Sequence, residues 1–326
     1  MRFGIIGTGF ISDWFVDACR VAGGTPVAIC SRDADRGREF ATRHGLGQVV
    51  TTPEALAGLD EVEAIYLASP IASHHDQAVI ALSAGKHVLG EKTLTTSPDR
   101  ARALFDLAAR QQRVLLEAIR PTHDPAYRPI REAVGRLGTL RHAHFEKCQY
   151  SSRYPGFLRG ERPNALDPAS GNSALRDLGV YCLHPALELF GSPSRFTGTT
   201  YRLENGFEAG GTTVLDYGTF SVTCAYSKVA RSVAPSVIEG EAGSLTIDSL
   251  AEPADVRLIG LDGSVEPVLS GPPRQPAESL RYEIEEFLRL CAAGEVDHPY
   301  RTNSLIAEQI ITGVSLSATP TWQALR

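Results

Sequence analysis

The chain has 326 residues, of which 43% are hydrophobic and 21% are charged. This composition is typical of a globular protein, and the length suits two domains. A formal net charge of −6 argues against the basic surface that nucleic-acid binding needs, and no apolar stretch approaches the ~18 residues of a membrane span. Because the apolar start is too short for a signal peptide, we expect a cytoplasmic protein without nucleic-acid or membrane partners.

The first 120 residues alternate between short apolar runs and stretches with helical spacing. The apolar runs, which we interpret as strands, cover residues 3–6, 27–30, 64–68, 87–89 and 114–118. Helices are predicted over residues 11–21, 35–44, 75–83 and 98–111. Strands that are apolar throughout are buried on both faces, and their alternation with helices predicts right-handed βαβ units. We therefore expect an α/β domain, a Rossmann fold with a parallel sheet, over residues 1–120.

The pattern changes after Arg120, because strand-like stretches now follow one another without helices between them. They include residues 140–150, 212–216, 220–226, 236–239 and 244–247. Asp216, Tyr217 and Gly218 predict a hairpin turn. Further helices are predicted over residues 126–134, 174–190, 278–293 and 304–317. We expect residues 121–326 to form a C-terminal α+β domain with a large, mostly antiparallel sheet.

Neither the cysteines nor the histidines form a metal-binding pattern. The six cysteines lie far apart, without a C-x-x-C pair, which indicates buried thiols in a reducing compartment; sequence alone leaves one disulfide open. His74 and His75 are adjacent and would point in different directions on a helix. We therefore predict no metal site.

A glycine-rich loop follows the first predicted strand and opens the first predicted helix. It consists of Gly7, Thr8, Gly9, Phe10, Ile11 and Ser12. In a dinucleotide-binding loop the first glycine permits a tight turn, the second lets the backbone approach the pyrophosphate, and a small third residue lets the helix pack on the strand. The helix N-terminus then faces the phosphates. The alternative is a glycine turn at an ordinary strand-to-helix junction.

The end of the second predicted strand indicates which nicotinamide cofactor is bound. Enzymes that use NAD place a carboxylate there, whereas this strand is followed by Ser31 and Arg32. A hydroxyl beside a guanidinium suits a 2′-phosphate, so we predict that NADP(H) is preferred, with NAD(H) possible. The alternative is a surface Arg32 that pairs with Asp33 or Asp35.

Lys92 follows Glu91 just past the carboxyl end of a predicted parallel strand, where open α/β sheets bind ligands. A lysine there can hold a hydroxyl or carbonyl oxygen beside the nicotinamide and move its proton. The alternative is a surface lysine that pairs with Glu91. Arg120 stands at the end of the last predicted strand of this domain. Its side chain could contact the substrate or only the linker to the second domain, and the sequence favours neither interpretation.

Four polar side chains recur at helical spacing in the helix predicted over residues 174–190. They are Asp177, Tyr181, His184 and Glu188, separated by four, three and four residues. An unbroken helix would present all four on one face, although Pro185 could kink it before Glu188. Two acids, a phenol and an imidazole on one face are not typical of a purely apolar core. The alternatives are a solvated face, a half-buried Tyr181 and a packing role for His184.

The order of these motifs resembles the Gfo/Idh/MocA family of oxidoreductases over essentially the full length. The resemblance rests on the loop at residues 7–12, the segment 84–93 and the segment 177–184. Ser69 and Pro70, followed by His74, are similar to the nicotinamide loop of the family. The chain departs from the family pattern at Thr93, where proline is usual, at Ile71, where asparagine is common, and at residues 171–173, where glycines often stand.

The resemblance implies roles for the polar residues. Lys92 would bind the substrate and relay its proton, Tyr181 would be the acid/base, and Asp177 would orient the substrate or Lys92. His184 would bind substrate or complete the relay. A phenol ordinarily titrates near pH 10, so Tyr181 needs a nearby cation, for which Lys92 is a candidate. The cofactor would contact Ser69, Pro70, His74, Glu91 and Lys92 besides the glycine loop.

The resemblance also implies an activity. We expect an NADP(H)-dependent oxidoreductase that transfers a hydride between nicotinamide, held at a cleft between the domains, and a carbinol or carbonyl carbon of a sugar, polyol, inositol or similar vicinal diol. One alternative is a glycosidase-type enzyme that uses tightly bound nicotinamide for transient oxidation; another is a non-catalytic nucleotide-sensing protein. The open sheet face of the second domain predicts a homodimer or homotetramer.

Overall fold

The computed structural model describes residues 1–317 and 323–325. The chain divides into two compact units, which are described separately. The first unit comprises Met1–Arg120 and Pro276–Leu305, and the second comprises Pro121–Gln275 and the described residues from Ile306 onward.

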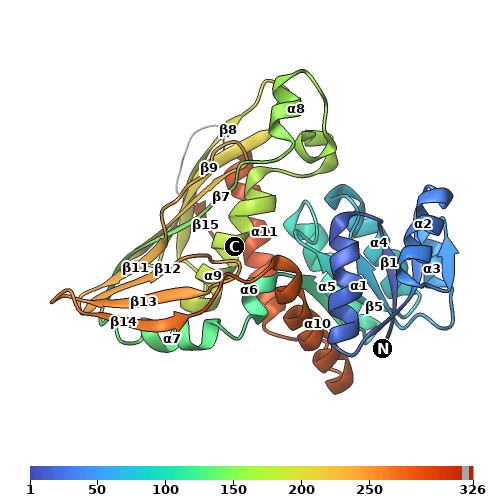
Figure 1. The fold of residues 1–326 in the computed structure, drawn as a ribbon, viewed down its shortest axis with the longest axis horizontal. Helices are drawn as coiled ribbons and strands as arrows, with labels where there is room; N and C mark the ends of the chain where they lie inside the picture. Colours follow the sequence, from blue (N-terminus) through green and yellow to red (C-terminus); the bar gives the residue numbers. More distant parts are fainter. Residues whose placement is uncertain (318–322, 326) are drawn as a thin grey trace. The chain divides into compact units, whose positions relative to one another are not determined.

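The first unit is built on a six-stranded parallel sheet with the strand order β3-β2-β1-β4-β5-β6 (Figure 1). Its strands are β1 (Arg2–Ile6), β2 (Thr25–Cys30), β3 (Gln48–Val50), β4 (Ala64–Leu67), β5 (His87–Glu91) and β6 (Leu115–Ala118). The helices between them are α1 (Phe10–Val21), α2 (Ala34–His44), α3 (Pro53–Ala57), α4 (Ile71–Ser83) and α5 (Pro98–Arg110). This strand order is that of a Rossmann fold, so the predicted parallel α/β domain is confirmed.

One helix of the first unit comes from the far end of the chain. Helix α10 (Pro276–Ala293) packs against α1, because Leu280, Ile284 and Phe287 form an apolar stripe at spacings of four and three that is fully buried in the core of this unit. The division expected at residue 120 therefore needs correction: residues 276–305 were assigned to the second domain, but they complete the first.

The second unit is built on a nine-stranded sheet in the order β14-β13-β12-β11-β7-β10-β9-β8-β15. All neighbouring strands are antiparallel except β7 and β10, which pair in parallel, so the prediction of a mostly antiparallel sheet is confirmed. The strands are β7 (Leu140–Cys148), β8 (Arg195–Arg202), β9 (Glu208–Asp216), β10 (Ser221–Ser227), β11 (Ser236–Gly240), β12 (Gly243–Ile247), β13 (Asp255–Gly260), β14 (Val265–Ser270) and β15 (Gln323–Ala324). The predicted hairpin turn joins β9 to β10, with Gly218 at a φ of 84°.

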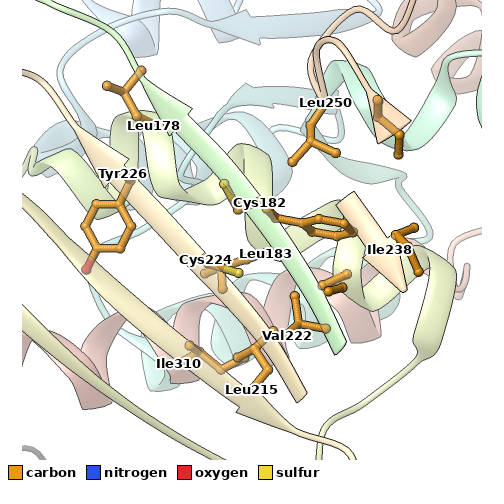
Figure 2. Close-up of a cluster of buried hydrophobic side chains, with 14 of the residues drawn as sticks. Leu178, Cys182, Leu183, Leu215, Val222, Cys224, Tyr226, Ile238, Leu250 and Ile310 are labelled. Carbon is orange, nitrogen blue, oxygen red and sulfur yellow. The ribbon is translucent and has the colours of Figure 1, made fainter. Parts of the chain in front are cut away.

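The remaining helices are α6 (Arg120–His123), α7 (Tyr127–Val134), α8 (Tyr154–Leu158), α9 (Val180–Phe190) and α11 (Tyr300–Leu316). Of these, α7, α9 and α11 contribute buried residues to the core on one face of the sheet. Short 3-10 turns span Asn164–Leu166 and Pro168–Ser170, and a π-helical segment, η3 (Leu175–Gly179), leads into α9. Figure 2 shows the core between α9 and the sheet, where Leu183 and Cys182 lie against Val222, Cys224 and Ile238.

The two faces of this sheet differ in burial. Along β10 the side chains of Val222, Cys224 and Tyr226 are buried, whereas those of Thr223 and Ala225 on the opposite face are only half-buried. The same alternation occurs on β12. The second face is therefore incompletely covered by the described parts of the chain.

Candidate functional site

The glycine-rich loop joins β1 to α1, as predicted. Gly7 has a φ of 109° and donates its N–H to the carbonyl oxygen of Cys30 at 3.1 Å. A Cβ at this position would lie 2.5 Å from the carbonyl oxygen of Ala68, so the packing of the chain itself requires glycine here. Ser12 is buried and donates its hydroxyl to the carbonyl oxygen of Gly7 at 2.8 Å, which fastens the loop to the first turn of α1.

Unlike Gly7, Gly9 is not required to be glycine by its backbone conformation or by contacts within the chain. It is the N-cap of α1 with an ordinary φ of −78°, and a Cβ added to it would meet no atom of the described chain within 4 Å. The space in front of this backbone is therefore open to a ligand. Phe10, Ile11 and the half-buried Thr8 surround the same helix N-terminus, where N–H groups face outward without a side-chain cap.

Ser31 and Arg32 follow β2 directly. Ser31 is buried and Arg32 is exposed. Asp33 caps α2 by accepting the backbone N–H groups of Asp35 and Arg36 at 3.0 and 3.1 Å, and its ion pair is with Arg36 at 3.7 Å. Within residues 1–317 and 323–325, Arg32 forms no ion pair with either aspartate. Its guanidinium is thus available to an anionic ligand.

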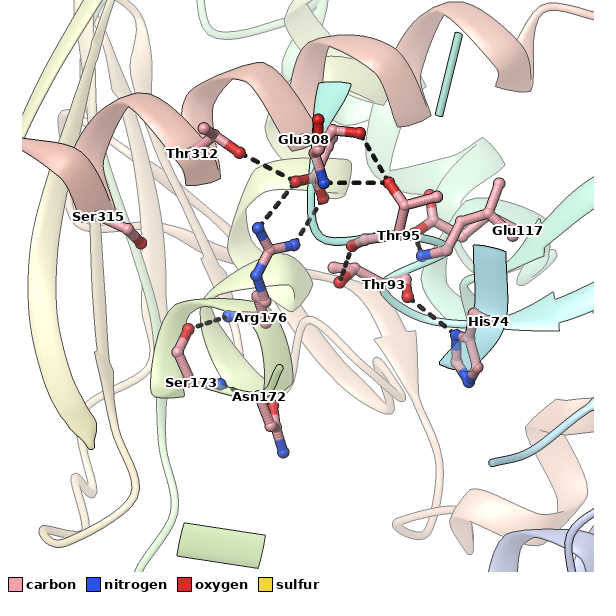
Figure 3. A network of polar contacts seen from close by, with 12 residues as sticks. His74, Thr93, Thr95, Glu117, Asn172, Ser173, Arg176, Glu308, Thr312 and Ser315 are labelled. Carbon is pink, nitrogen blue, oxygen red and sulfur yellow. Dashed lines mark hydrogen bonds and ion pairs between the residues drawn. The ribbon is translucent and has the colours of Figure 1, made fainter. Parts of the chain in front are cut away.

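His74 connects the loops that follow β4 and β5 in the first unit. Its ring nitrogens lie 2.7 Å from the carbonyl oxygen of Ser69 and 3.1 Å from that of Thr93, the second contact being drawn in Figure 3. The ring is buried, and burial lowers the pKa of His74. Pro70 caps α4, and the Ser69 hydroxyl donates to Gln77 at 2.6 Å. Each ring nitrogen of His74 therefore faces a backbone carbonyl oxygen, one in each of the two loops.

Glu91 and Lys92 stand at the carboxyl end of β5, the position that the sequence predicts. The Tyr66 hydroxyl donates to one carboxylate oxygen of Glu91 at 2.6 Å, and the backbone N–H of Lys92 donates to the other at 3.3 Å. Burial raises the pKa of Glu91, while the Lys92 ammonium and the Tyr66 hydrogen bond oppose this shift. Tyr66 is itself stacked on Phe15 at a centroid distance of 3.8 Å. Lys92 thus projects from a rigidly packed strand end.

In the second unit, Asp177, Tyr181 and His184 lie on successive turns of one helical segment. The expected unbroken α-helix from residue 174 is wrong in detail, because Leu175–Gly179 is π-helical and α9 begins only at Val180. The wider π turn displaces Asp177 from the simple helical face that its spacing predicts.

Two lysines that sequence reasoning missed contact this segment. The Lys228 ammonium is buried and paired with a carboxylate oxygen of Asp177. The Lys147 ammonium lies over the Tyr181 ring, 5.6 Å from its centroid, at a distance typical of a cation–π contact. A signal for Lys147 was present in the sequence, because it shares the inward phase of β7 with Ala143 and Phe145.

His184 and Glu188 occupy different environments farther along α9. His184 is 1% exposed, and burial lowers its pKa to about 4, so the imidazole is neutral near pH 7. Glu188 pairs with Arg131 of α7. A buried ion pair in this unit, Arg176 with Glu308, anchors the π-helical segment to α11, with contacts of 2.6 and 2.8 Å (Figure 3).

The described residues contain no group of histidine, cysteine or acidic side chains that could hold a metal ion. Among helices in residues 1–317 and 323–325, none is both long enough and apolar enough to span a bilayer.

Comparison with known proteins covers both units. A model of an oxidoreductase family with an NAD-binding Rossmann fold matches residues 1–118, and a model of the GFO/IDH/MocA C-terminal domain matches residues 127–246. The chain is 38% identical to the uncharacterized oxidoreductase YgjR of Escherichia coli (strain K12), over 96% of this chain and 95% of YgjR. It is 35% identical to the NADP(+)-linked scyllo-inositol 2-dehydrogenase IolU of Bacillus subtilis (strain 168), over 93% of this chain and 92% of IolU.

Solved structures share the fold. A 3-ketoreductase from Actinomadura kijaniata, KijD10, solved with NADP and TDP-benzene, superposes with a TM-score of 0.85 at 24% identity, covering 96% of both chains.

Proposed function

Because the chain belongs to the Gfo/Idh/MocA family of oxidoreductases, with an NAD-binding Rossmann fold, we propose that it transfers a hydride between NADP(H) and a carbinol or carbonyl carbon of a sugar, polyol, inositol or similar vicinal diol. The observation that carries this proposal is the position of Lys92 at the carboxyl end of β5. The glycine loop follows β1 of the same sheet, and its second glycine, Gly9, faces open space. The names of IolU and of the dihydrodiol dehydrogenases of mammals support the substrate class.

The residues of the first unit fit a nicotinamide dinucleotide. Gly7 and Gly9, with Thr8, Phe10 and Ile11, present backbone N–H groups at the start of α1, where a pyrophosphate is stabilised by unpaired donors and by the helix dipole. Nicotinamide supplies or accepts the hydride when bound. Ser69 and Pro70 would border the nicotinamide. His74 would act indirectly, because both of its ring nitrogens face backbone carbonyls.

Lysine and tyrosine side chains would handle the proton. Lys92 would hold the reacting oxygen of the substrate, and Tyr181 would donate or accept its proton. Lys147 would stabilise the negative charge that develops on Tyr181 when it gives up this proton, and Lys228 would fix the carboxylate of Asp177, which orients the substrate. His184, neutral and almost fully buried, would contribute packing or one hydrogen bond.

Arg32→Ala tests the cofactor preference. A charge-assisted contact to a 2′-phosphate is worth about 1.5–3 kcal/mol, so the variant should bind NADPH roughly 10- to 100-fold more weakly while its affinity for NADH stays unchanged. The measurement is a fluorescence titration of the purified protein with each cofactor. Arg38→Ala is the matched control, since Arg38 is also exposed but already pairs with Asp35. If NADH binds the unaltered protein as tightly as NADPH, the preference for NADP(H) is wrong.

We propose that the chain forms a homodimer or homotetramer through the incompletely covered face of the second sheet. Thr223→Arg would place a charge at the centre of this face, on β10, and should convert the assembly to monomers in sedimentation velocity experiments. Val233→Arg, at a position that is 94% exposed, should leave the assembly intact. A monomeric unaltered protein would contradict the proposal.

A further inference from the structure

Glu283 is a buried acid that the proposed reaction does not use. It lies on the second turn of α10, between Leu280 and Ile284, and is 1% exposed. Neither of its carboxyl oxygens has a hydrogen-bond partner within the described chain. Native proteins rarely leave a buried carboxyl group in this condition, and such exceptions often have a functional reason.

The charged groups around Glu283 belong to the end of β5 and to the start of α6. Glu91, Lys92 and Arg120 act electrostatically on its carboxyl group, and all of them lie in the first unit. Tyr66 of β4 belongs to the same set. Its hydroxyl donates to Glu91, and burial, together with the charges of Glu91 and Glu283, raises its pKa. Tyr66 also packs in the same apolar core as Leu280 and Ile284, which flank Glu283. Two carboxyl groups, two cations and a phenol therefore form one cluster in the first unit, in which Tyr66 and Glu283 are buried and Glu91, Lys92 and Arg120 are half-buried.

The two acids are not equivalent. Glu91 accepts hydrogen bonds from Tyr66 and from the backbone of Lys92, which favour its charged form. Glu283 accepts none, and burial, followed by repulsion from Glu91, raises its pKa well above the usual range. Of the two acids, Glu283 therefore holds a proton more strongly, and the charge of Glu91 is favoured by Lys92 and Arg120.

We propose that Glu283 is a positioning residue for Lys92, acting on it through the cluster of Glu91, Tyr66 and Arg120. The inference rests on the proposed role of Lys92. While Glu283 is neutral, it adds no negative charge near Lys92, and Lys92 can exchange a proton with the substrate. When Glu283 loses its proton, a second buried negative charge strengthens the hold of Lys92 on its own proton, so the cluster restricts the pH range in which Lys92 can act.

Glu283→Gln, in the protein without added cofactor, tests this coupling directly. Acetic anhydride labels only unprotonated amines, so the labelling of Lys92 as a function of pH, read by peptide mass spectrometry, reports its protonation. The glutamine cannot ionise, and the labelling midpoint of Lys92 should fall by about one pH unit. Glu285→Gln, the same change at an exposed position of α10, should leave the midpoint in place. An unchanged midpoint in Glu283→Gln overturns the proposal.

Thermal stability gives a second readout. A group whose pKa is raised by folding stabilises the chain at pH values below its unfolded pKa, and this contribution is lost as the pH rises through the folded pKa. The Tm of Glu283→Gln relative to the unaltered protein should therefore increase between pH 5 and pH 9. A Tm difference that stays constant with pH would contradict the presence of a buried neutral acid at this position.

If the glutamine variant does not fold, Glu283→Asp replaces it in the labelling assay. The aspartate keeps the ionisable group, so the labelling midpoint of Lys92 should equal that of the unaltered protein. A lowered midpoint overturns the proposal.

The labelling assay also separates this inference from the proposed function. If Lys92→Ala abolishes turnover while Glu283→Gln leaves the labelling of Lys92 unchanged, only the inference fails. If the labelling shifts but Lys92→Ala is fully active, the role of Lys92 fails, and with it the assignment of Glu283 as a positioning residue.

Discussion

Lys92→Ala is expected to lower kcat by about 10²- to 10⁴-fold, the range typical of a lost proton-transfer group. The residue stands at the end of a strand fixed by the Tyr66–Glu91 hydrogen bond, so its removal should not disturb the sheet. Binding of NADPH should change by less than about threefold, because the glycine loop after β1 and Ser31–Arg32 after β2 would hold the phosphates, whereas Lys92 would contact only the nicotinamide end of the cofactor. Stopped-flow or steady-state turnover of a polyol or inositol with NADP measures kcat, and fluorescence measures binding.

Lys92→Arg sharpens the result. Arginine keeps the positive charge but is effectively always protonated, so it should retain part of the substrate affinity while kcat stays as low as in the alanine variant. An arginine variant with near-normal kcat would mean that Lys92 acts only through its charge, and a fully active alanine variant would remove Lys92 from the reaction.

Tyr181→Phe should lower kcat by roughly 10²- to 10³-fold if the phenol is the acid/base. The ring and its contact with Lys147 remain in place, so the fold and substrate affinity should change little. Tyr282→Phe, which removes the hydroxyl of a half-buried tyrosine on α10, is the matched control and should be silent.

The double variant Lys92→Ala/Tyr181→Phe tests whether the two residues serve the same proton. Residues that act as a unit show losses far smaller than the product of the single effects. The double variant should therefore be little slower than the slower single variant. Fully multiplicative losses would indicate that the two residues act in separate steps.

The sequence predicted the first unit well, because its signals are local. A strand that ends in Gly7 and continues into a helix can be identified from adjacent residues, and the structure places this loop, Ser31–Arg32 and Glu91–Lys92 at the ends of β1, β2 and β5. These positions follow from the chain order of a parallel sheet.

The sequence could not predict features that depend on packing between distant segments. The ion pair of Lys228 with Asp177 joins residues 51 positions apart, and the π-helical turn at Leu175–Gly179 has no propensity signal. In the sequence, Glu283 cannot be distinguished from Glu285 and Glu286, the neighbouring acids of the same amphipathic helix. Its burial follows from the packing of α10 in the first unit, which no local signal in the sequence predicts.

The return of α10 to the first unit has a consequence for biosynthesis. The Rossmann core needs Leu280, Ile284 and Phe287 to cover the face that Phe3 and Phe15 present, yet these residues are made more than 260 positions later. Domains normally fold in the order of their translation. Here an apolar surface of the nucleotide-binding unit stays uncovered until nearly all of the second sheet has left the ribosome. At that stage we expect the nascent chain to bind chaperones.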